Sequence, residues 1–163
     1  MPKQRLIITL VLLLLLAAGG YYQYRKYRVP PEFDLNRIEA KDLSGANFNA
    51  DDWKNQHLVI AYFATWCIDC RRELPQLEAI EPELIRNGVK VILLSDEDQN
   101  KLQSFSKALP ETFTIFRLNE EFRQSEIYTL PTNYLIRPDG SIFLQKTGAV
   151  DWNKDLIMAF TAS

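Results

Sequence analysis

The stretch Ala64-Thr65-Trp66-Cys67-Ile68-Asp69-Cys70 contains both cysteines of the 163-residue chain. It follows the apolar run 58–63, which predicts a buried strand, and it precedes a segment whose apolar residues recur at helical spacing. Cys67 is therefore expected at a helix N-terminus, where unpaired N–H groups and the helix dipole stabilise a thiolate. Because Cys70 lies one turn further on, the pair can alternate between dithiol and disulfide by exchange with cysteines of another protein.

A zinc half-site is the alternative interpretation of this pair. A structural zinc ion takes four ligands. Beyond the pair, the sequence has no cysteine and a single histidine, His57, which we expect in a loop before a strand. The sequence therefore favours redox chemistry and predicts neither a metal nor another cofactor.

Composition and charge indicate an ordinary globular protein. The chain is 47% hydrophobic and 25% charged, and its length suits one compact domain with an appended segment. The net charge of −2, with no basic cluster in the body of the chain, gives no indication of a nucleic-acid partner.

The appended segment is at the start of the chain. Residues 6–22 carry no charge, and about 17–25 apolar residues suffice to cross a bilayer. Ala17-Ala18-Gly19 could alternatively be the cleavage site of a signal peptide, whose apolar core has about 7–15 residues. An uncleaved anchor is favoured by the interfacial aromatic and basic residues that follow, Tyr21, Tyr22, Tyr24, Arg25, Lys26 and Arg28.

We therefore divide the chain into an anchor or signal peptide (1–24), a linker (25–35) with the extended break Val29-Pro30-Pro31-Glu32, and a folded domain (36–163). Basic residues flank the apolar run on both sides, so charge alone does not orient it. A dithiol–disulfide domain is most useful where disulfides form and persist. We expect a single-pass protein of the bacterial inner membrane with its domain in the periplasm.

Within the domain, strands alternate with helices. Pro75 is expected to bend the first helix, and Asp139-Gly140 between two apolar runs predicts a hairpin. Strands are predicted at 58–63, 89–94, 113–116, 133–136 and 141–146, helices at 70–87, 97–109, 120–128 and 151–160, and a small leading hairpin within 36–53. The predicted fold class is α/β, with a central mixed sheet flanked by helices.

The motif Thr129-Leu130-Pro131-Thr132 is the second part of the candidate site. A proline that opens a strand can simply be a turn residue, because it donates no ladder hydrogen bond. Only about 5–6% of X–Pro bonds are cis. About sixty residues after a Trp-Cys-x-x-Cys motif, however, we expect a cis-proline loop packed beside Cys67.

The chain resembles the thioredoxin superfamily, and within it the membrane-anchored TlpA/ResA-like thiol–disulfide oxidoreductases, which include cytochrome c maturation reductases. The resemblance covers roughly residues 36–160. Its motifs are Phe63-Ala64-Thr65-Trp66-Cys67-Ile68-Asp69-Cys70-Arg71-Arg72-Glu73-Leu74-Pro75, Leu130-Pro131-Thr132-Asn133-Tyr134-Leu135-Ile136 and Pro138-Asp139-Gly140.

The resemblance implies roles for individual residues. Cys67 would be the nucleophile and Cys70 the resolving thiol. The cis-proline Pro131, with Leu130, would dock the backbone of a partner. Trp66 would offer it a flat apolar surface, unless the indole is only a packing residue.

Two positions depart from the family pattern. The buried acid found six residues before the first cysteine in thioredoxins is replaced by Ala61, and the usual proline before the second cysteine is replaced by Asp69. Asp69 could disfavour a neighbouring thiolate, act as a general base toward Cys70, or point to solvent. Glu73 is a second candidate for tuning thiol pKa values, although we expect it on the helix surface.

The sequence thus predicts an anchored reductase of disulfides in exported proteins, served by a membrane electron donor, with a possible role in cytochrome c maturation. A disulfide oxidant or isomerase is the alternative within the same chemistry, because the direction of electron flow depends on the reduction potential of the cysteine pair. A metallochaperone or binding module is a third alternative, disfavoured because no histidine follows Cys70. A peroxidase would need an isolated reactive cysteine, which the chain lacks.

Overall fold

The computed structural model describes residues 2–28 and 31–162. A six-stranded mixed sheet with the order β1-β4-β3-β2-β5-β6 forms the centre of the domain. The central strands β2, β3 and β4 are parallel, while β1, β5 and β6 pair antiparallel to their neighbours. The strands are β1 (Ala40–Asp42), β2 (His57–Tyr62), β3 (Val89–Ser95), β4 (Phe113–Leu118), β5 (Thr132–Ile136) and β6 (Ile142–Thr147).

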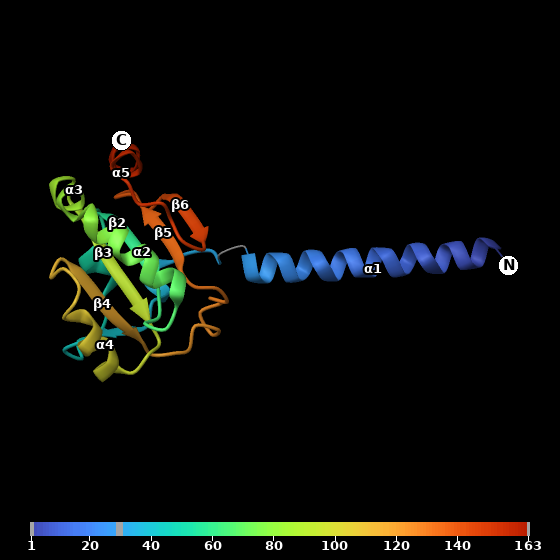
Figure 1. Ribbon diagram of the computed structural model, residues 1–163, viewed down its shortest axis with the longest axis horizontal. Helices are drawn as coiled ribbons and strands as arrows, with labels where there is room; N and C mark the ends of the chain where they lie inside the picture. Colours follow the sequence, from blue (N-terminus) through green and yellow to red (C-terminus); the bar gives the residue numbers. More distant parts are fainter. Residues whose placement is uncertain (1, 29–30, 163) are drawn as a thin grey trace.

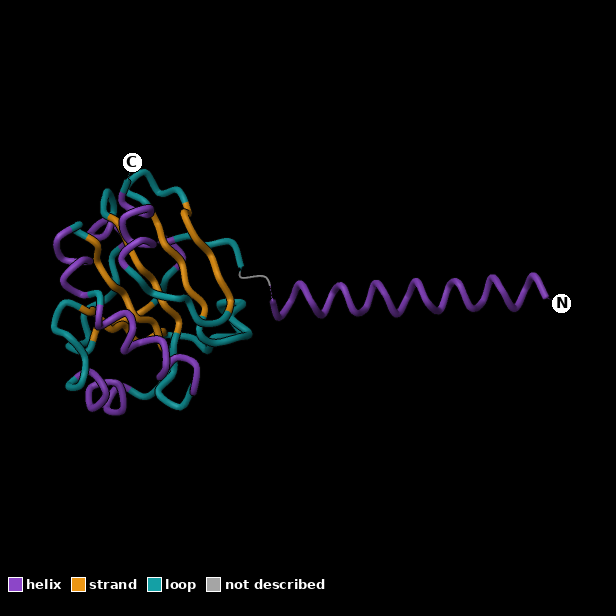
Figure 2. Tube along the Cα trace, turned by 45° about the horizontal axis from the view of Figure 1, so that its top comes forward, coloured by secondary structure: helices purple, strands orange, loops and turns teal. Residues whose placement is uncertain are grey.

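Helices flank this sheet, as Figures 1 and 2 show. Because β2 and β3 are covered on both faces, they are near-continuous apolar runs rather than alternating ones. The α-helices are α1 (Pro2–Arg28), α2 (Ile68–Ala79), α3 (Glu81–Arg86), α4 (Gln99–Ser106) and α5 (Lys154–Thr161), and short 3₁₀ turns lie at Leu35–Arg37 and Ala50–Trp53. The predicted α/β fold with a helix-flanked mixed sheet is confirmed.

Helix α1 projects from the domain as a single rod (Figure 1). Within its stretch Lys3–Tyr27, an 18-residue window has a mean hydropathy of 2.0 and is not buried in the protein, so by length and composition the helix can cross a membrane. The helix continues past residue 24, where the sequence suggested the anchor would end, to Arg28. Val29 and Pro30 of the predicted extended break lie outside the described residues.

The predicted helix 70–87 is in fact two helices, α2 and α3, joined at Ile80. The break follows from Pro82, which occupies the first turn of α3 and has no N–H for the carbonyl of Glu78. Pro75 lies within α2 without ending it.

The predicted helix 120–128 is wrong, since this segment forms turns. The backbone closes there in the pattern that ends a helix: the Ile127 N–H donates to the Phe122 carbonyl at 2.8 Å and the Glu126 N–H to the Arg123 carbonyl at 3.2 Å. At the start of the turn, the Asp96 carboxylate accepts from the Phe122 N–H at 3.1 Å. Glu126 adopts a φ of 58°, in the left-handed region.

The two predicted hairpins have different outcomes. The hairpin of β5 and β6 around Asp139-Gly140 is confirmed, and Gly140 has the positive φ of 82° that such a turn requires. The leading hairpin is reduced to one bridge between Lys41 and Asn47, because β1 pairs instead with β4.

Candidate redox site

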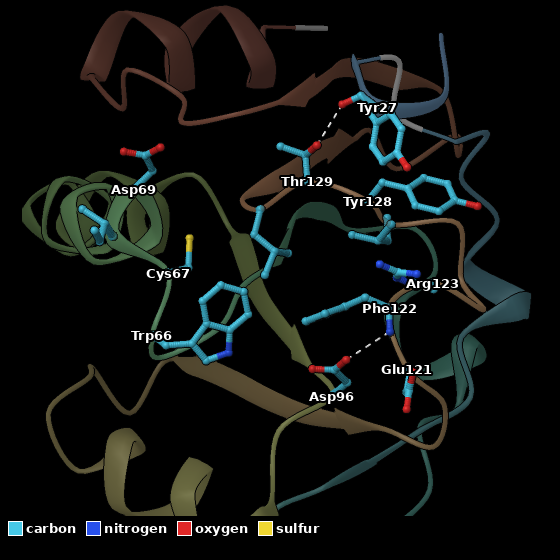
Figure 3. Close-up of a pocket in the computed structure, with 13 residues that line it drawn as sticks. Tyr27, Trp66, Cys67, Asp69, Asp96, Glu121, Phe122, Arg123, Tyr128 and Thr129 are labelled. Carbon is cyan, nitrogen blue, oxygen red and sulfur yellow. Dashed lines mark hydrogen bonds between the residues drawn. The ribbon is translucent and has the colours of Figure 1, made fainter. Parts of the chain in front are cut away.

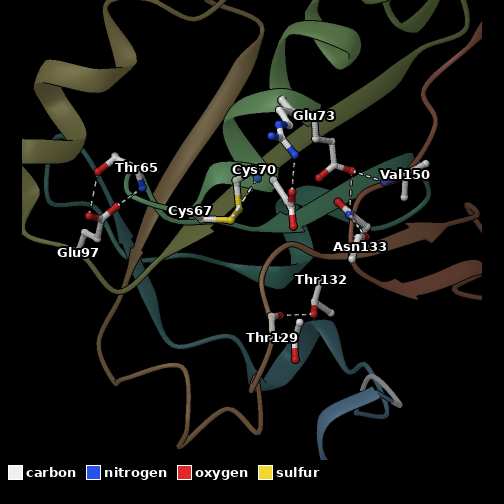
Figure 4. The surroundings of a disulfide bond; sticks show 12 residues. Thr65, Cys67, Cys70, Glu73, Glu97, Thr129, Thr132, Asn133 and Val150 are labelled. Atoms are coloured by element: carbon white, nitrogen blue, oxygen red, sulfur yellow. Dashed lines mark hydrogen bonds and ion pairs between the residues drawn. A yellow bond between two sulfur atoms is a disulfide. The ribbon is translucent and has the colours of Figure 1, made fainter.

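The two cysteines lie where β2 leads into α2. Cys67 occupies the N-cap position of α2, its Sγ accepts a hydrogen bond from the Cys70 N–H at 3.1 Å, and the two residues form a disulfide with Cα atoms 5.3 Å apart (Figure 4). Cys70 is 1% exposed and Cys67 6%. The first cysteine is thus the more accessible one, at a helix N-terminus that stabilises a thiolate.

The loop before Cys67 is held by Glu97, a residue that the sequence did not single out. The Glu97 carboxylate accepts from the backbone N–H of Thr65 at 2.5 Å and from its hydroxyl at 2.9 Å (Figure 4). Lys101 forms an ion pair with the same carboxylate at 2.5 Å. Burial raises the pKa of Glu97, but the hydrogen bonds from Lys101 and Thr65 outweigh it, and the pKa lies below its usual value. Glu97 is therefore a buried anion that fixes the loop presenting Trp66 and Cys67.

The cis peptide bond predicted at Pro131 is confirmed, between Leu130 and Pro131. The loop is fixed on its far side, where the Pro131 carbonyl accepts from the Gly148 N–H at 2.7 Å, and within itself, where the Thr132 hydroxyl donates to the Thr129 carbonyl at 2.8 Å. Leu130 borders the same groove as Cys67. The docking of a partner on Leu130 and Pro131 stays a prediction.

A groove of about 650 Å³ opens beside Cys67 (Figure 3). Trp66, at 65% exposure, offers its indole to this groove, so it is not a packing residue of the core. The other residues that line the groove are Tyr27, Cys67, Ile68, Asp69, Asp96, Glu121, Phe122, Arg123, Ile127, Tyr128, Thr129 and Leu130.

Glu73 is buried, and its predicted place on the helix surface is wrong. Its side chain is 4% exposed, and one carboxylate oxygen, Oε1, accepts three hydrogen bonds. The donors are the Asn133 amide at 2.9 Å and the Val150 N–H at 2.9 Å, both drawn in Figure 4, and the Trp152 indole N–H at 2.8 Å. Burial raises the pKa of Glu73 to about 7, against the opposing effect of these hydrogen bonds.

Helical spacing could have identified Glu73. It lies three residues after Cys70 and next to Leu74, on the buried stripe of α2 that also includes Leu77. The position of the acid missing at Ala61 is itself buried on β2. A buried carboxyl is thus present one helical turn after the second cysteine rather than six residues before the first.

The remaining predicted residues lie apart from this buried network. The Asp69 side chain borders the groove, is 62% exposed and lies 3.4 Å from Arg72, which agrees with the solvent-facing alternative. His57 is the first residue of β2 rather than a loop residue, with its ring 5.0 Å from that of Phe160. In residues 2–28 and 31–162, no three His, Cys, Asp or Glu side chains are grouped to hold a metal ion.

Among known proteins, the chain is similar to thiol-disulfide oxidoreductases. The chain is 29% identical over 126 residues to the sporulation thiol-disulfide oxidoreductase A of Bacillus subtilis, covering 74% of this chain and 73% of that protein. It is 27% identical over 149 residues to the thiol-disulfide oxidoreductase ResA of Bacillus thuringiensis, covering 88% of this chain and 86% of that protein.

Solved structures support the same fold. The crystal structure of StoA from Bacillus subtilis matches with a TM-score of 0.56 at 24% identity, over 82% of this chain and 98% of that one. A putative thiol:disulfide interchange protein DsbE from Chlorobium tepidum matches with a TM-score of 0.62 at 19% identity, over 82% and 92%. The AhpC/TSA family matches residues 30–144. With its Cys67–Cys70 pair and its relatives, the chain therefore belongs to the thioredoxin-like AhpC/TSA family and is a thiol–disulfide oxidoreductase.

Proposed function

We propose that this protein is a membrane-anchored, extracytoplasmic reductase of disulfides in exported proteins, apocytochrome c among them. One observation carries the proposal. The more accessible cysteine, Cys67, lies at the N-terminus of α2 in an open groove, while Cys70 is buried behind it. A pair arranged in this way can attack a partner disulfide with one sulfur and release the product with the other.

The reaction proceeds in two exchanges. The Cys67 thiolate attacks one sulfur of the substrate disulfide, forms a mixed disulfide and releases the second substrate sulfur as a thiolate. Cys70 then loses its proton and attacks the Cys67 sulfur, which frees the first substrate thiolate and leaves the enzyme disulfide seen here. Two electrons pass from the enzyme dithiol to the substrate, and a membrane electron donor restores the dithiol.

Glu73 is the proposed acceptor of the Cys70 proton. A general base works best when its pKa lies near the operating pH, and burial brings the pKa of Glu73 to about 7. It lies one turn after Cys70 on α2, whereas Glu97 is already committed to Lys101 and Thr65. Asp69, exposed at the rim of the groove, has at most a weak electrostatic influence on Cys67.

The proposed place of action is the outer face of the bacterial inner membrane. Support comes from the apolar stretch Lys3–Tyr27 of α1 and from the ResA-type relatives. A reporter enzyme that is active only after export, fused to the C-terminus, should be active. A silent fusion that is stably expressed would contradict the proposed orientation.

Trapping of substrates tests the roles of the cysteines. In Cys70→Ser the mixed disulfide on Cys67 cannot be resolved, so exported proteins should remain attached to the enzyme through a bond that dithiothreitol cleaves. Cys67→Ser is the matched control and should trap none. Equal trapping by both variants, or trapping by Cys67→Ser alone, would contradict the assignment.

The direction of electron flow is tested by the reduction potential of the pair, measured by equilibration with dithiothreitol or glutathione. A value near that of thioredoxin, about −270 mV, supports the reductase. A value near that of a strong oxidant, about −120 mV, would favour disulfide formation instead.

A further inference from the structure

The last turn of the membrane-type helix α1 reaches the redox groove. Tyr27 is the one residue of α1 among the side chains that line it. Figure 3 shows Tyr27 across the groove from Trp66, with the Cys67 sulfur on the side of Trp66. The groove beside the cysteine thus includes a residue of α1 that lies almost forty positions before the redox motif.

Three contacts attach α1 to the segment that precedes the cis-proline. The Thr129 hydroxyl donates to the Tyr27 carbonyl at 2.8 Å (Figure 3). The Tyr27 and Tyr128 rings meet edge to face with centroids 5.5 Å apart. The Lys26 ammonium lies 5.0 Å from the centroid of the Tyr128 ring, within cation–π range.

These contacts act on the part of the domain that has least regular structure. The segment between β4 and β5 consists of turns, and it carries Tyr128, Thr129 and Leu130 directly before Pro131. Because the Thr129 carbonyl also accepts from Thr132, at the start of β5, the hydrogen bonds link α1 through Thr129 to the sheet. The end of α1 is therefore connected to the loop that carries Leu130.

The composition of the groove indicates what it binds. Trp66 is 65% exposed and Tyr27 44% exposed, so two aromatic rings from opposite sides remain free for contact. Apolar side chains continue between them, contributed by Phe122, Ile127 and Leu130. Aromatic and aliphatic walls around one reactive sulfur suit an extended segment with apolar residues on both sides of its cysteine.

We propose that Tyr27 is a specificity-determining residue, and that the end of α1 forms one wall of the substrate groove, holding apolar cysteine segments against Trp66. The inference rests on the proposed exchange chemistry and extends it from the cysteine pair to the choice of substrate. The anchor is then part of the enzyme's binding site as well as its tether.

The test uses the full-length protein, reduced and reconstituted in lipid nanodiscs. One substrate is a peptide with leucine and valine on both sides of a single cysteine that carries a thionitrobenzoate group. The reference substrate is the small disulfide of two thionitrobenzoates. In both reactions the enzyme dithiol is oxidised once and coloured thionitrobenzoate is released. Single-turnover rates at varied substrate concentration therefore give kcat/KM as a second-order rate constant, and KM as the half-saturating concentration, for each substrate.

Tyr27→Ala should lower the ratio of the two kcat/KM values, peptide over small disulfide, about three- to tenfold, as expected for the loss of one aromatic contact. The loss should be in KM for the peptide. Tyr27→Phe should restore the ratio, because the Tyr27 contacts found here use only its ring and its carbonyl. The matched control is Tyr24→Ala, which removes another exposed tyrosine of α1 that does not line the groove. It also corrects for binding of the peptide to lipid.

An unchanged ratio in Tyr27→Ala would overturn the inference, as would an equal fall in Tyr24→Ala. In either case the unmodified protein still consumes the small disulfide, so the proposed function survives. If the unmodified protein consumes neither substrate, the proposed function fails and the inference fails with it.

Discussion

Glu73 and Glu97 are both buried glutamates near the redox motif, but only Glu97 forms an ion pair, and the pKa values of the two carboxyls shift in opposite directions. Glu97 has a cation, Lys101, at 2.5 Å and two hydrogen bonds from Thr65. Glu73 has three neutral donors, and burial is the largest influence on its pKa. The pKa of Glu97 is lowered, while that of Glu73 is raised to about 7.

The difference separates a structural anion from a group that can exchange a proton. A buried carboxylate with a counter-charge stays ionised and can only hold its neighbours in place. In a buried carboxyl without a counter-charge, burial disfavours the ionised form and raises the pKa, so the group gains and loses its proton near neutral pH. The protein thus has a fixed clamp before Cys67 and a titrating group after Cys70.

Removal of the Glu73 carboxyl should have the largest effect on stability. Glu73→Ala leaves the Asn133 amide, the Val150 N–H and the Trp152 indole without their acceptor. Each buried donor left unpaired costs about 1–3 kcal/mol, so the free energy of unfolding should fall by about 3–5 kcal/mol. Urea denaturation at pH 6 measures it. Glu97→Ala is the matched comparison, and a larger loss there would reverse our ranking of the two sites.

Neutral replacement of Glu73 should change the pH dependence of stability. The folded pKa of about 7 is above the reference value of 4.5, so the folded state holds the proton more tightly. As pH rises from 4.5 to 7, the unmodified protein should therefore lose about 3 kcal/mol relative to Glu73→Gln. Denaturation of both proteins between pH 4 and pH 8 checks this. Parallel curves would mean that folding does not shift the pKa of Glu73.

Glu97 should show the opposite sign. Its folded pKa is depressed, so its contribution is present above the unfolded pKa and is lost as pH falls through the folded pKa. Glu97→Gln should cost about 1–2 kcal/mol at pH 7, where a charge-assisted hydrogen bond is weakened. The cost should shrink in acid. If it grew instead, the clamp would not depend on the charge of Glu97.

An exposed carboxylate should matter least. Asp69 is next to the second cysteine, but its side chain is 62% exposed and close to Arg72. In a Cys70→Ser background, Asp69→Asn should lower the pKa of Cys67 by only a fraction of a unit, because a like charge weakly disfavours the thiolate. Titration of the thiolate absorbance measures it. A shift above one unit would show that burial is not what distinguishes the three acids.

The local parts of the site could be predicted from the sequence. The cysteine pair at a strand–helix junction, the cis bond at Pro131 and the Asp139-Gly140 hairpin all depend on neighbouring residues. The surroundings of Glu73 could not, because its donors come from Asn133, Val150 and Trp152, sixty or more residues away.

Long-range contacts also explain the other failures. Glu97 holds Thr65 across 32 positions of sequence, and no local pattern signals such a pair. The segment 120–128 is rich in helix-forming residues, but the chain turns at Glu126, which has a φ of 58°, and the distant Asp96 carboxylate holds the Phe122 N–H at the start of that turn. In both places the structure includes contacts between residues that are distant in the sequence, and local preference alone does not predict them.

Helix α1 also fixes the distance between the redox groove and the membrane surface. Tyr27, at the edge of the groove, lies only five positions after Tyr22, where the apolar run ends, which is about 7.5 Å along a helix. In a bilayer, the reactive sulfur would then lie close to the headgroup layer, instead of moving over a wide range of positions on a flexible linker. Partners confined to the same surface would meet it by two-dimensional diffusion, at an effective concentration fixed by the geometry of the membrane.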